Sequence, residues 1–144
     1  MKKLTILAFA LLCALPALGQ GATNPCASYP VQRVNINFTA NTQLVTGVTG
    51  QKIYICHVFI SPLATATNIA FASGTGSVCG SNTTGVITGG DGTAAKGANL
   101  AANSGWVQGT GAAVVDYLPV GMNLCLNVSA ANQISGIIQY VIAP

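Results

Sequence analysis

QKIYICHVFIS, residues 51–61, is the stretch around which the rest of the chain is organised. No other stretch is so continuously apolar and β-favouring, because its isoleucines and valine are β-branched and its tyrosine and phenylalanine suit a pleated, packed surface. A turn-forming sequence precedes it at 47–50 and Pro62 follows it, so both of its ends are bounded. The pattern predicts a central β-strand.

Both faces of this predicted strand are apolar. Side chains alternate between the two faces of a strand, and strict alternation divides the residues into two sets. These are Ile53, Ile55, His57 and Phe59 on one face, and Tyr54, Cys56, Val58 and Ile60 on the other. Since a sandwich strand normally leaves one face to solvent, we expect a terminal segment, a loop or another subunit to cover the second face.

The first nineteen residues have the features of a signal peptide. Two lysines start the segment, residues 4–15 form an apolar run, and Ala17-Leu18-Gly19 provides a small-x-small cleavage sequence. The alternative, a membrane anchor, needs about 20 apolar residues. We therefore expect cleavage after residue 19, which leaves residues 20–144 as a single exported domain with no membrane span.

Charge is sparse in the expected mature chain. It carries a net charge of +1, from Arg33, Lys52 and Lys96 against Asp91 and Asp116. Nucleic-acid binding is disfavoured, because it needs clustered lysine and arginine to neutralise phosphates. Disorder is disfavoured as well, because the chain is 51% hydrophobic. Neighbouring copies of such a chain repel one another weakly.

Four cysteines remain after the expected cleavage, namely Cys26, Cys56, Cys79 and Cys125. An even number in an exported chain indicates two disulfides. No pair has CxxC spacing and the chain has a single histidine, so a zinc site is the weaker interpretation. We expect neither a metal nor a cofactor.

Predicted strands and turns alternate along the rest of the chain. After an irregular lead-in at 23–30, further strands are predicted at 31–38, 43–48, 65–73, 85–88, 96–102, 112–118, 123–129 and 133–142. We expect the strand at 65–73 to form a hairpin with the central strand across Pro62-Leu63-Ala64. Turn signals about every 8–12 residues, with no visible helical period, are typical of a β-sandwich or barrel.

Five short motifs follow one another in a fixed order: YIC at 54–56, GTG at 74–76 with Cys79 close behind, LAANSGW at 100–106, LC at 124–125 and SGIIQY at 135–140. In this order they resemble a group of small secreted β-sandwich proteins encoded by environmental tailed phages and some bacteria. The resemblance covers most of the mature chain. That family carries no established activity, so the resemblance implies a setting, a virion-associated or cell-surface accessory protein.

We expect the fold to be a jelly-roll-like antiparallel β-sandwich of about eight strands. In that topology the N-terminal segment runs beside the first long strand, which brings Cys26 to Cys56. The strand after the central one lies antiparallel to the penultimate strand, which brings Cys79 to Cys125. The predicted disulfides are therefore Cys26–Cys56 and Cys79–Cys125.

The chain contains few residues suited to catalysis. His57 with Asp116 and a serine contains the residue types of a nucleophile–base–orienter set, but no serine lies in a GxSxG elbow. A structural, hydrogen-bonded histidine is the better account of His57 on an apolar face. Glycosidase chemistry needs two carboxylates, and Asp91 lies in Gly-Gly-Asp-Gly, which is typical of a tight turn rather than a calcium site. We expect no catalytic residue and no enzyme.

Trp106 is the one candidate ligand-binding residue. It is the only tryptophan and lies in a polar, Gly-rich stretch. Exposed aromatic side chains on sandwich loops stack on sugar rings or anchor partners. The alternative is a tryptophan that closes the end of the core, because large apolar groups are usually buried.

These observations favour a non-enzymatic exported structural or attachment module that decorates a phage virion or contacts a host surface. The alternative is a secreted carbohydrate-binding or adhesin module. Its location would be secreted, periplasmic or the virion surface, and its partners a virion shell or a cell-surface glycan. The apolar faces of residues 51–61 and 133–142 favour self-association, as a trimer by resemblance to viral jelly rolls. In the competing account the segment around Cys26 covers the second face and the protein is a monomer.

Overall fold

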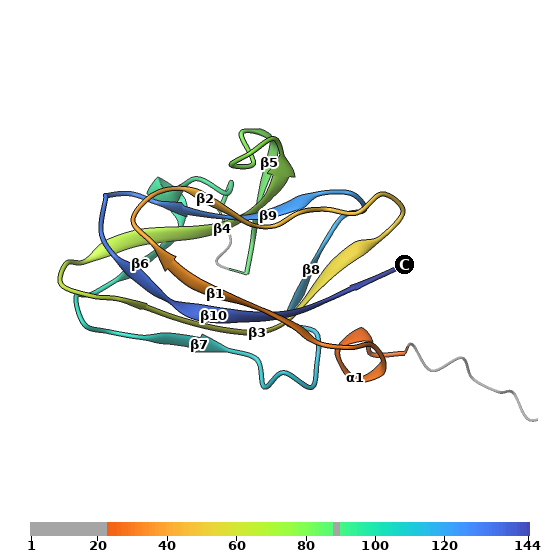
Figure 1. Ribbon diagram of the computed structural model, residues 1–144. Helices are drawn as coiled ribbons and strands as arrows, with labels where there is room; N and C mark the ends of the chain where they lie inside the picture. The colour runs from red at the N-terminus through yellow and green to blue at the C-terminus, as the bar shows by residue number, and fades with distance from the viewer. Residues whose placement is uncertain (1–22, 88–89) are drawn as a thin grey trace, which may run out of the picture.

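The computed structural model describes residues 23–87 and 90–144. The predicted signal peptide, residues 1–19, lies outside the described residues. In the described part, ten strands form two antiparallel sheets that pack face to face (Figure 1). The predicted all-β sandwich is confirmed, and so are both predicted disulfides, Cys26–Cys56 and Cys79–Cys125.

The wrapping of the chain is jelly-roll-like. In chain order the elements are α1 (Pro25–Ser28), β1 (Gln32–Phe38), β2 (Thr42–Val45), β3 (Lys52–Pro62), β4 (Thr67–Thr75), β5 (Ser81–Val86), the 3-10 turn η1 (Ala94–Lys96), β6 (Ala98–Leu100), β7 (Trp106–Gln108), β8 (Asp116–Leu118), β9 (Asn123–Val128) and β10 (Ile134–Ala143). Sheet A has the order β1-β10-β3, with β7 and β8 both beside β3. Sheet B has the order β2-β9-β4, with β5 and β6 both beside β4. The chain thus alternates between the sheets from β1 to β4 and again from β8 to β10.

Several local predictions are wrong. The strand at 65–73 does not form a hairpin with the central strand, because β4 lies in sheet B and pairs with β9, while β3 pairs with β10 in sheet A. Each strand thereby lies beside a long partner and turns one face to the shared core. The lead-in at 23–30 contains α1, which Asn24 caps by accepting a hydrogen bond from the Cys26 amide. The strands predicted at 96–102 and 112–118 shorten to β6 and β8, and β7, of three residues, is a strand that the pattern does not predict.

A β-bulge in the middle of β3 corrects the predicted division of its faces. In the register with β10, Gln139 lies opposite His57 and Tyr140 opposite Ile55, so Cys56 is an extra residue on β3. The bulge reverses the alternation after Ile55. Consequently Ile53, Ile55, Val58 and Ile60 are all fully buried in the one core between the sheets. The predicted assignment of residues to the two faces is therefore wrong, while the outer face still carries the apolar side chains of Tyr54, Cys56 and Phe59.

The outer face of β3 is covered at the bulge by a terminal segment and a loop, two of the three covers that were expected. Cys26 of α1 forms a small buried cluster with Cys56, Val141 and Ala143, against which Tyr54 packs. The loop between β7 and β8 closes over the same place, because the amides of Gly111 and Val115 donate to the carbonyls of Cys56 and Ile55. These contacts agree with the alternative in which the segment around Cys26 covers the second face of the strand.

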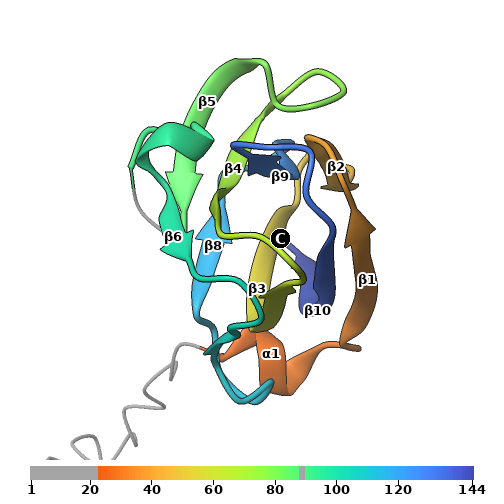
Figure 2. The ribbon, with the colours of Figure 1, turned by 90° about the vertical axis from the view of Figure 1, so that its left-hand side faces the viewer.

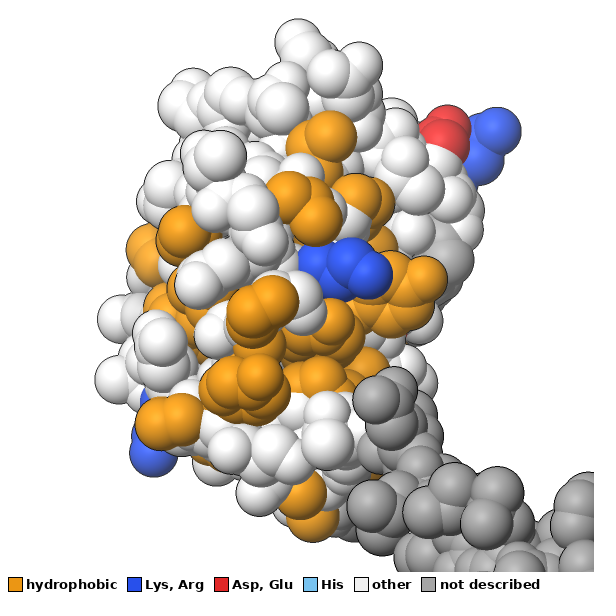
Figure 3. All heavy atoms as spheres, turned by 90° about the vertical axis from the view of Figure 1, so that its right-hand side faces the viewer, with side chains coloured by type: hydrophobic (Ala, Val, Ile, Leu, Met, Phe, Trp, Pro, Cys, Tyr) orange, Lys and Arg blue, Asp and Glu red, His pale blue; other side chains and the backbone are white. Residues whose placement is uncertain are grey.

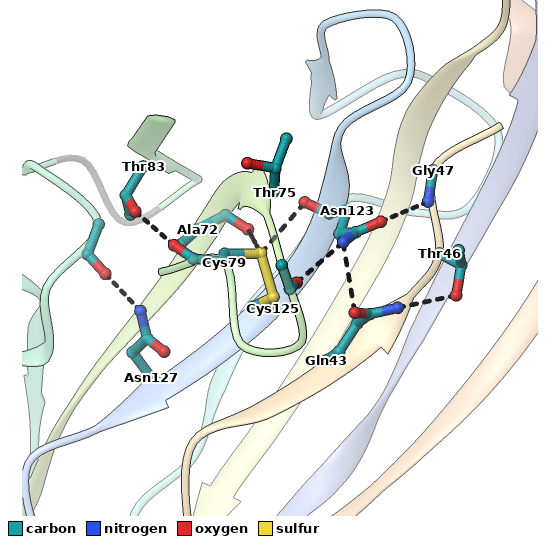
Figure 4. Close-up of a disulfide and its surroundings, with 12 residues drawn as sticks. Gln43, Thr46, Gly47, Ala72, Thr75, Cys79, Thr83, Asn123, Cys125 and Asn127 are labelled. Atoms are coloured by element: carbon teal, nitrogen blue, oxygen red, sulfur yellow. Dashed lines mark hydrogen bonds between the residues drawn. A yellow bond between two sulfur atoms is a disulfide. The ribbon is translucent and has the colours of Figure 1, made fainter. Parts of the chain in front are cut away.

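The second disulfide anchors the connection between β4 and β5 to sheet B (Figure 4). Asn123, at the start of β9, bonds three segments beside it: its amide donates to Gln43 and to the Gly76 carbonyl, and its Oδ1 accepts from the Gly47 amide at 2.8 Å. Thr83 donates to the carbonyl of Cys79. The loops at this end of the sandwich are thus tied together by bonds as well as by the disulfide.

We predict that the Cys79–Cys125 bond contributes a large share of the stability. It joins residues 46 apart in sequence, and the chain-entropy model gives roughly 4 kcal/mol for a loop of that length. Replacing both cysteines by alanine should lower the free energy of unfolding in urea by roughly 3–4 kcal/mol. A melting temperature that did not change on reduction of the wild-type protein would show that the cysteines are not bonded in solution.

Candidate functional site

The three groups considered for catalysis lie apart and are engaged by the backbone. The Nδ1 atom of His57 lies 2.8 Å from the carbonyl oxygen of Gly109 on the outer side of sheet A. Asp116 pairs with Ile55, whose side chain is buried in the core, so its carboxylate faces the interior side of the same sheet. His57 and Asp116 therefore point to opposite faces of sheet A, which agrees with the structural account of His57.

The close approach of Gly109 to β3 positions His57. Gly109 has φ +81°, and a Cβ atom there would lie 2.4 Å from the carbonyl oxygen of Cys56. Only glycine fits this left-handed position beside the bulge without moving the loop. The imidazole thus helps to hold the loop between β7 and β8 against sheet A.

Asp91 lies in a turn, as its sequence indicated. Its Oδ1 accepts hydrogen bonds from the Thr93 amide at 2.9 Å and from the Thr93 hydroxyl at 2.6 Å. These bonds, helped by the charge of Lys96, hold the pKa of this exposed carboxyl below its ordinary value. In the parts of the chain that the structure describes, histidine, cysteine, aspartate and glutamate form no group of three that could hold a metal ion.

Trp106 faces the core rather than solvent. In β7 it lies opposite Ile60, and its partly buried ring packs on the main core with its centroid 6.3 Å from that of Phe71. This position corresponds to the alternative in which the tryptophan closes the edge of the core. The surface suited to a ligand lies elsewhere, beside β8.

A cleft of about 290 Å³ lies between the edge strands β5 and β8, one from each sheet. Its lining consists of Ser73, Thr84, Gly85, Val86, Asp116, Tyr117 and Pro119. The cleft therefore combines one carboxylate and three hydroxyl-bearing side chains with the apolar surfaces of Val86 and Pro119. Such a mixture of polar and apolar lining is typical of sites for small polar ligands.

Asp116 shapes this cleft. Its Oδ2 accepts a hydrogen bond from the amide of Ile87 at 2.8 Å, and its Oδ1 accepts one from the amide of Tyr117 at 2.8 Å. Ile87 has φ +64°, a strained conformation for a β-branched residue. The carboxylate thus ties the end of β5 to β8. Among residues 23–87 and 90–144, each of its oxygens accepts one of these two hydrogen bonds and no cation forms an ion pair with it.

An aromatic surface adjoins the cleft at Tyr117. We define the aromatic end surface as Val48, Lys52, Tyr54, Tyr117 and Val120. The tyrosine rings lie opposite one another on β3 and β8, with centroids 6.2 Å apart, and the Lys52 ammonium lies 5.2 Å from the centroid of Tyr117. Figure 3 shows hydrophobic side chains gathered on the end of the molecule that it faces.

The loops beneath this surface are fixed in place. The amide of Gly121 donates to the carbonyl of Gln51 at 3.1 Å, and the Gly47 amide donates to the side chain of Asn123. Tyr117 is 53% exposed and Val120 48% exposed, so the surface is open to a partner. A partner would therefore meet a surface that is already ordered.

Reasoning from the sequence missed this site. Tyr54 was treated as part of a covered strand face, and Tyr117 as an ordinary member of a predicted strand. The pair forms only because β8 joins the edge of β3, a contact between segments 63 residues apart in sequence. The signal that could have identified the site is the pair Asp116-Tyr117. The chain has only two acidic residues, and this one is followed directly by an aromatic residue.

Comparison with known proteins leaves the site without a relative. The chain matches no protein-family model, and neither curated proteins nor solved structures give a match. In the described residues no helix is long and apolar enough to cross a membrane. The two disulfides fit a chain that folds in an oxidising compartment.

We predict that Asp116 stabilises the side of the sandwich where β5 and β8 lie next to each other. In Asp116→Ala the amide of Ile87 loses its acceptor, so the free energy of unfolding should fall by about 1–3 kcal/mol. Asp116→Asn keeps one acceptor oxygen and should cost less than half as much. Equal losses for the two variants in urea denaturation would contradict this role.

Proposed function

We propose that the protein is a non-enzymatic, exported attachment module that binds its partner through the aromatic end surface. The observation that carries the proposal is the exposed ring of Tyr117, which lies beside the half-buried Tyr54 and Lys52 on the ordered end of a disulfide-linked sandwich. Tyrosine supplies a large, rigid contact area at low entropic cost, and it is frequent among the residues that dominate binding energy.

The placement of the remaining polar groups supports a binding role over a catalytic one. His57 and Asp116 face opposite sides of sheet A, and Asp91 serves a turn. A nucleophile, its base and the group that orients the base must lie within hydrogen-bonding reach of one another. His57 and Asp116 do not, because they face opposite sides of sheet A.

The resemblance to phage-encoded β-sandwich proteins favours a virion as the place where the module acts. It would decorate the particle or contact the host surface. Its sparse charge agrees with a module that docks on a large assembly through apolar and polar contacts rather than by charge attraction. Two disulfides agree with a location outside the reducing cytoplasm.

A second candidate function, carbohydrate binding, is favoured by the cleft between β5 and β8. Its volume of about 290 Å³ suits a single sugar unit, and Asp116 and Thr84 supply oxygen atoms for sugar hydroxyl groups. The adjoining ring of Tyr117 offers a flat surface for the apolar side of a second sugar unit. The two functions are compatible, because a glycan is one form that a host-surface partner takes.

The attachment proposal predicts that Tyr117→Ala prevents incorporation into particles. Tyr117 is exposed, so the variant should fold like the wild type, and loss of one dominant aromatic contact should weaken binding at least ten-fold, about 1.4 kcal/mol. Quantitative mass spectrometry of purified phage particles measures incorporation. Val107→Ala, which is 59% exposed on β7, is the matched control. Equal incorporation of both variants, or no wild-type chain in the particles, would reject the proposal.

The carbohydrate-binding candidate predicts a different pattern on a glycan array. Thr84→Val keeps the shape of an exposed side chain but removes a hydroxyl group, so it should reduce glycan binding several-fold without changing the melting temperature. Asp116→Asn should reduce binding further, because it removes the charged acceptor. Wild-type protein that binds no glycan, or binding unchanged in Thr84→Val, would leave the cleft without a ligand role.

A further inference from the structure

Strand β1 forms one edge of sheet A, and its outer side is unpaired within the part of the chain that the structure describes. β1 pairs with β10 over all seven residues in a regular antiparallel register, from Gln32 opposite Tyr140 to Phe38 opposite Ile134. On its other side, β1 has no strand partner among residues 23–87 and 90–144. Figure 2 shows β1 at the margin of the molecule. The open side presents a row of backbone N–H and C=O groups, which can pair with a further strand.

The other strand edges of the sandwich are less suited to pairing. β2 has four residues with a register irregularity between Gln43 and Val45, and the pairing of β4 with β5 shifts between Ser73 and Thr75. On the opposite side, β6, β7 and β8 have three residues each. Short and irregular strands are common ways to protect a sheet edge. In the described part of the chain, β1 is the one long, regular edge without such protection.

We propose that β1 pairs with β1 of a second copy of this chain, antiparallel and about a two-fold axis at Asn35. Two conditions set this register. The inward side chains of both copies must stay on the core side, and the two strands must overlap along as many residues as possible. Both conditions are met when Asn35 lies opposite Asn35. It also sets Val34 opposite Ile36 and Arg33 opposite Asn37. The two sheets then continue as one across the dimer.

The side chains of β1 fit this register. Ile36 is buried, Val34 and Phe38 are half-buried, and the outward Arg33, Asn35 and Asn37 are exposed. The inward apolar side chains of one copy would therefore cover those of the other. Arg33, the one charged residue of β1, would face the neutral Asn37 instead of its own copy, so no like charges oppose each other directly.

A second copy fits this edge better than an isolated extended peptide does. β2 forms the edge of sheet B next to β1 in the chain, and the two strands lie in contact. On β2, Leu44 is half-buried and packs against the core. A single added strand would cover β1 alone, whereas the edge of a second sandwich is two layers deep and covers Leu44 as well.

This inference goes beyond the proposed function, because a module can bind a virion or a glycan as one copy or as two. It also rests on different grounds from the expectation of self-association through two apolar strand faces, since the segment around Cys26 covers the outer face of β3 at the bulge. Because pairing of β1 with β1 uses the same edge of both copies, the assembly stops at a dimer. It therefore differs from the trimer expected by resemblance to viral jelly rolls.

The test is the mass of the secreted chain in solution, measured by light scattering coupled to size-exclusion chromatography between 1 and about 100 μM. We expect a dimer at the upper concentrations. Asn35→Lys sets two lysines opposite each other on the axis and should raise the dissociation constant at least ten-fold. Asn37→Glu sets a carboxylate opposite Arg33 of the second copy and should lower it about three-fold or more.

Two controls separate the interface from general effects of charge and folding. Ala101→Lys adds the same charge to an exposed loop, away from β1, and should leave the dissociation constant unchanged. The melting temperature of each variant at low concentration confirms that the monomer folds. A wild-type monomer or trimer at the upper concentrations, or Asn35→Lys no weaker than Ala101→Lys, would overturn the proposal, as would Asn37→Glu that weakens the dimer.

Discussion

The β-bulge at Cys56 is the constraint on which the rest of the structure depends. One extra residue opposite β10 lets Ile53 and Ile55 before it, and Val58 and Ile60 after it, enter the same core. The bulge also leaves Cys56 on the outer side, where the disulfide to Cys26 and the loop between β7 and β8 cover it. A strand without the bulge would place half of these apolar side chains in water, at a cost of about 1.5–3 kcal/mol for each.

The proposed surfaces occupy different margins of sheet A. The aromatic end surface and the cleft lie at β8, on one side of β3, whereas β1 lies on the other side of the sheet beyond β10. Pairing through β1 would therefore leave Tyr117 free in both copies and present two aromatic end surfaces from one rigid dimer. Two linked sites bind a repetitive surface, such as a virion shell or a layer of glycans, more tightly than one site does.

Sparse charge gives the few polar groups in the molecule their importance. Asp116 is one of two acidic residues in the chain. Its carboxylate links the end of β5 to β8 and also lines the cleft. Lys52 is one of three cations after the expected cleavage, and it lies beside Tyr117. Most of the remaining surface is neutral, so both proposed modes of recognition rely on apolar contacts and backbone pairing rather than on charge.

The sequence by itself determined the all-β class, most strand positions and the number of disulfides, because alternation, turn residues and cysteine number are local or countable properties. The pairing of the cysteines followed only from the expected jelly-roll topology. Tertiary structure alone decided which faces β3 presents, that β3 and β4 form no hairpin, and that Tyr117 meets Tyr54. The physical reason is the same in each case. A strand's partner, and a bulge in its register, depend on which distant segment completes the core, and no residue of QKIYICHVFIS specifies β10 or β8 within its own pattern.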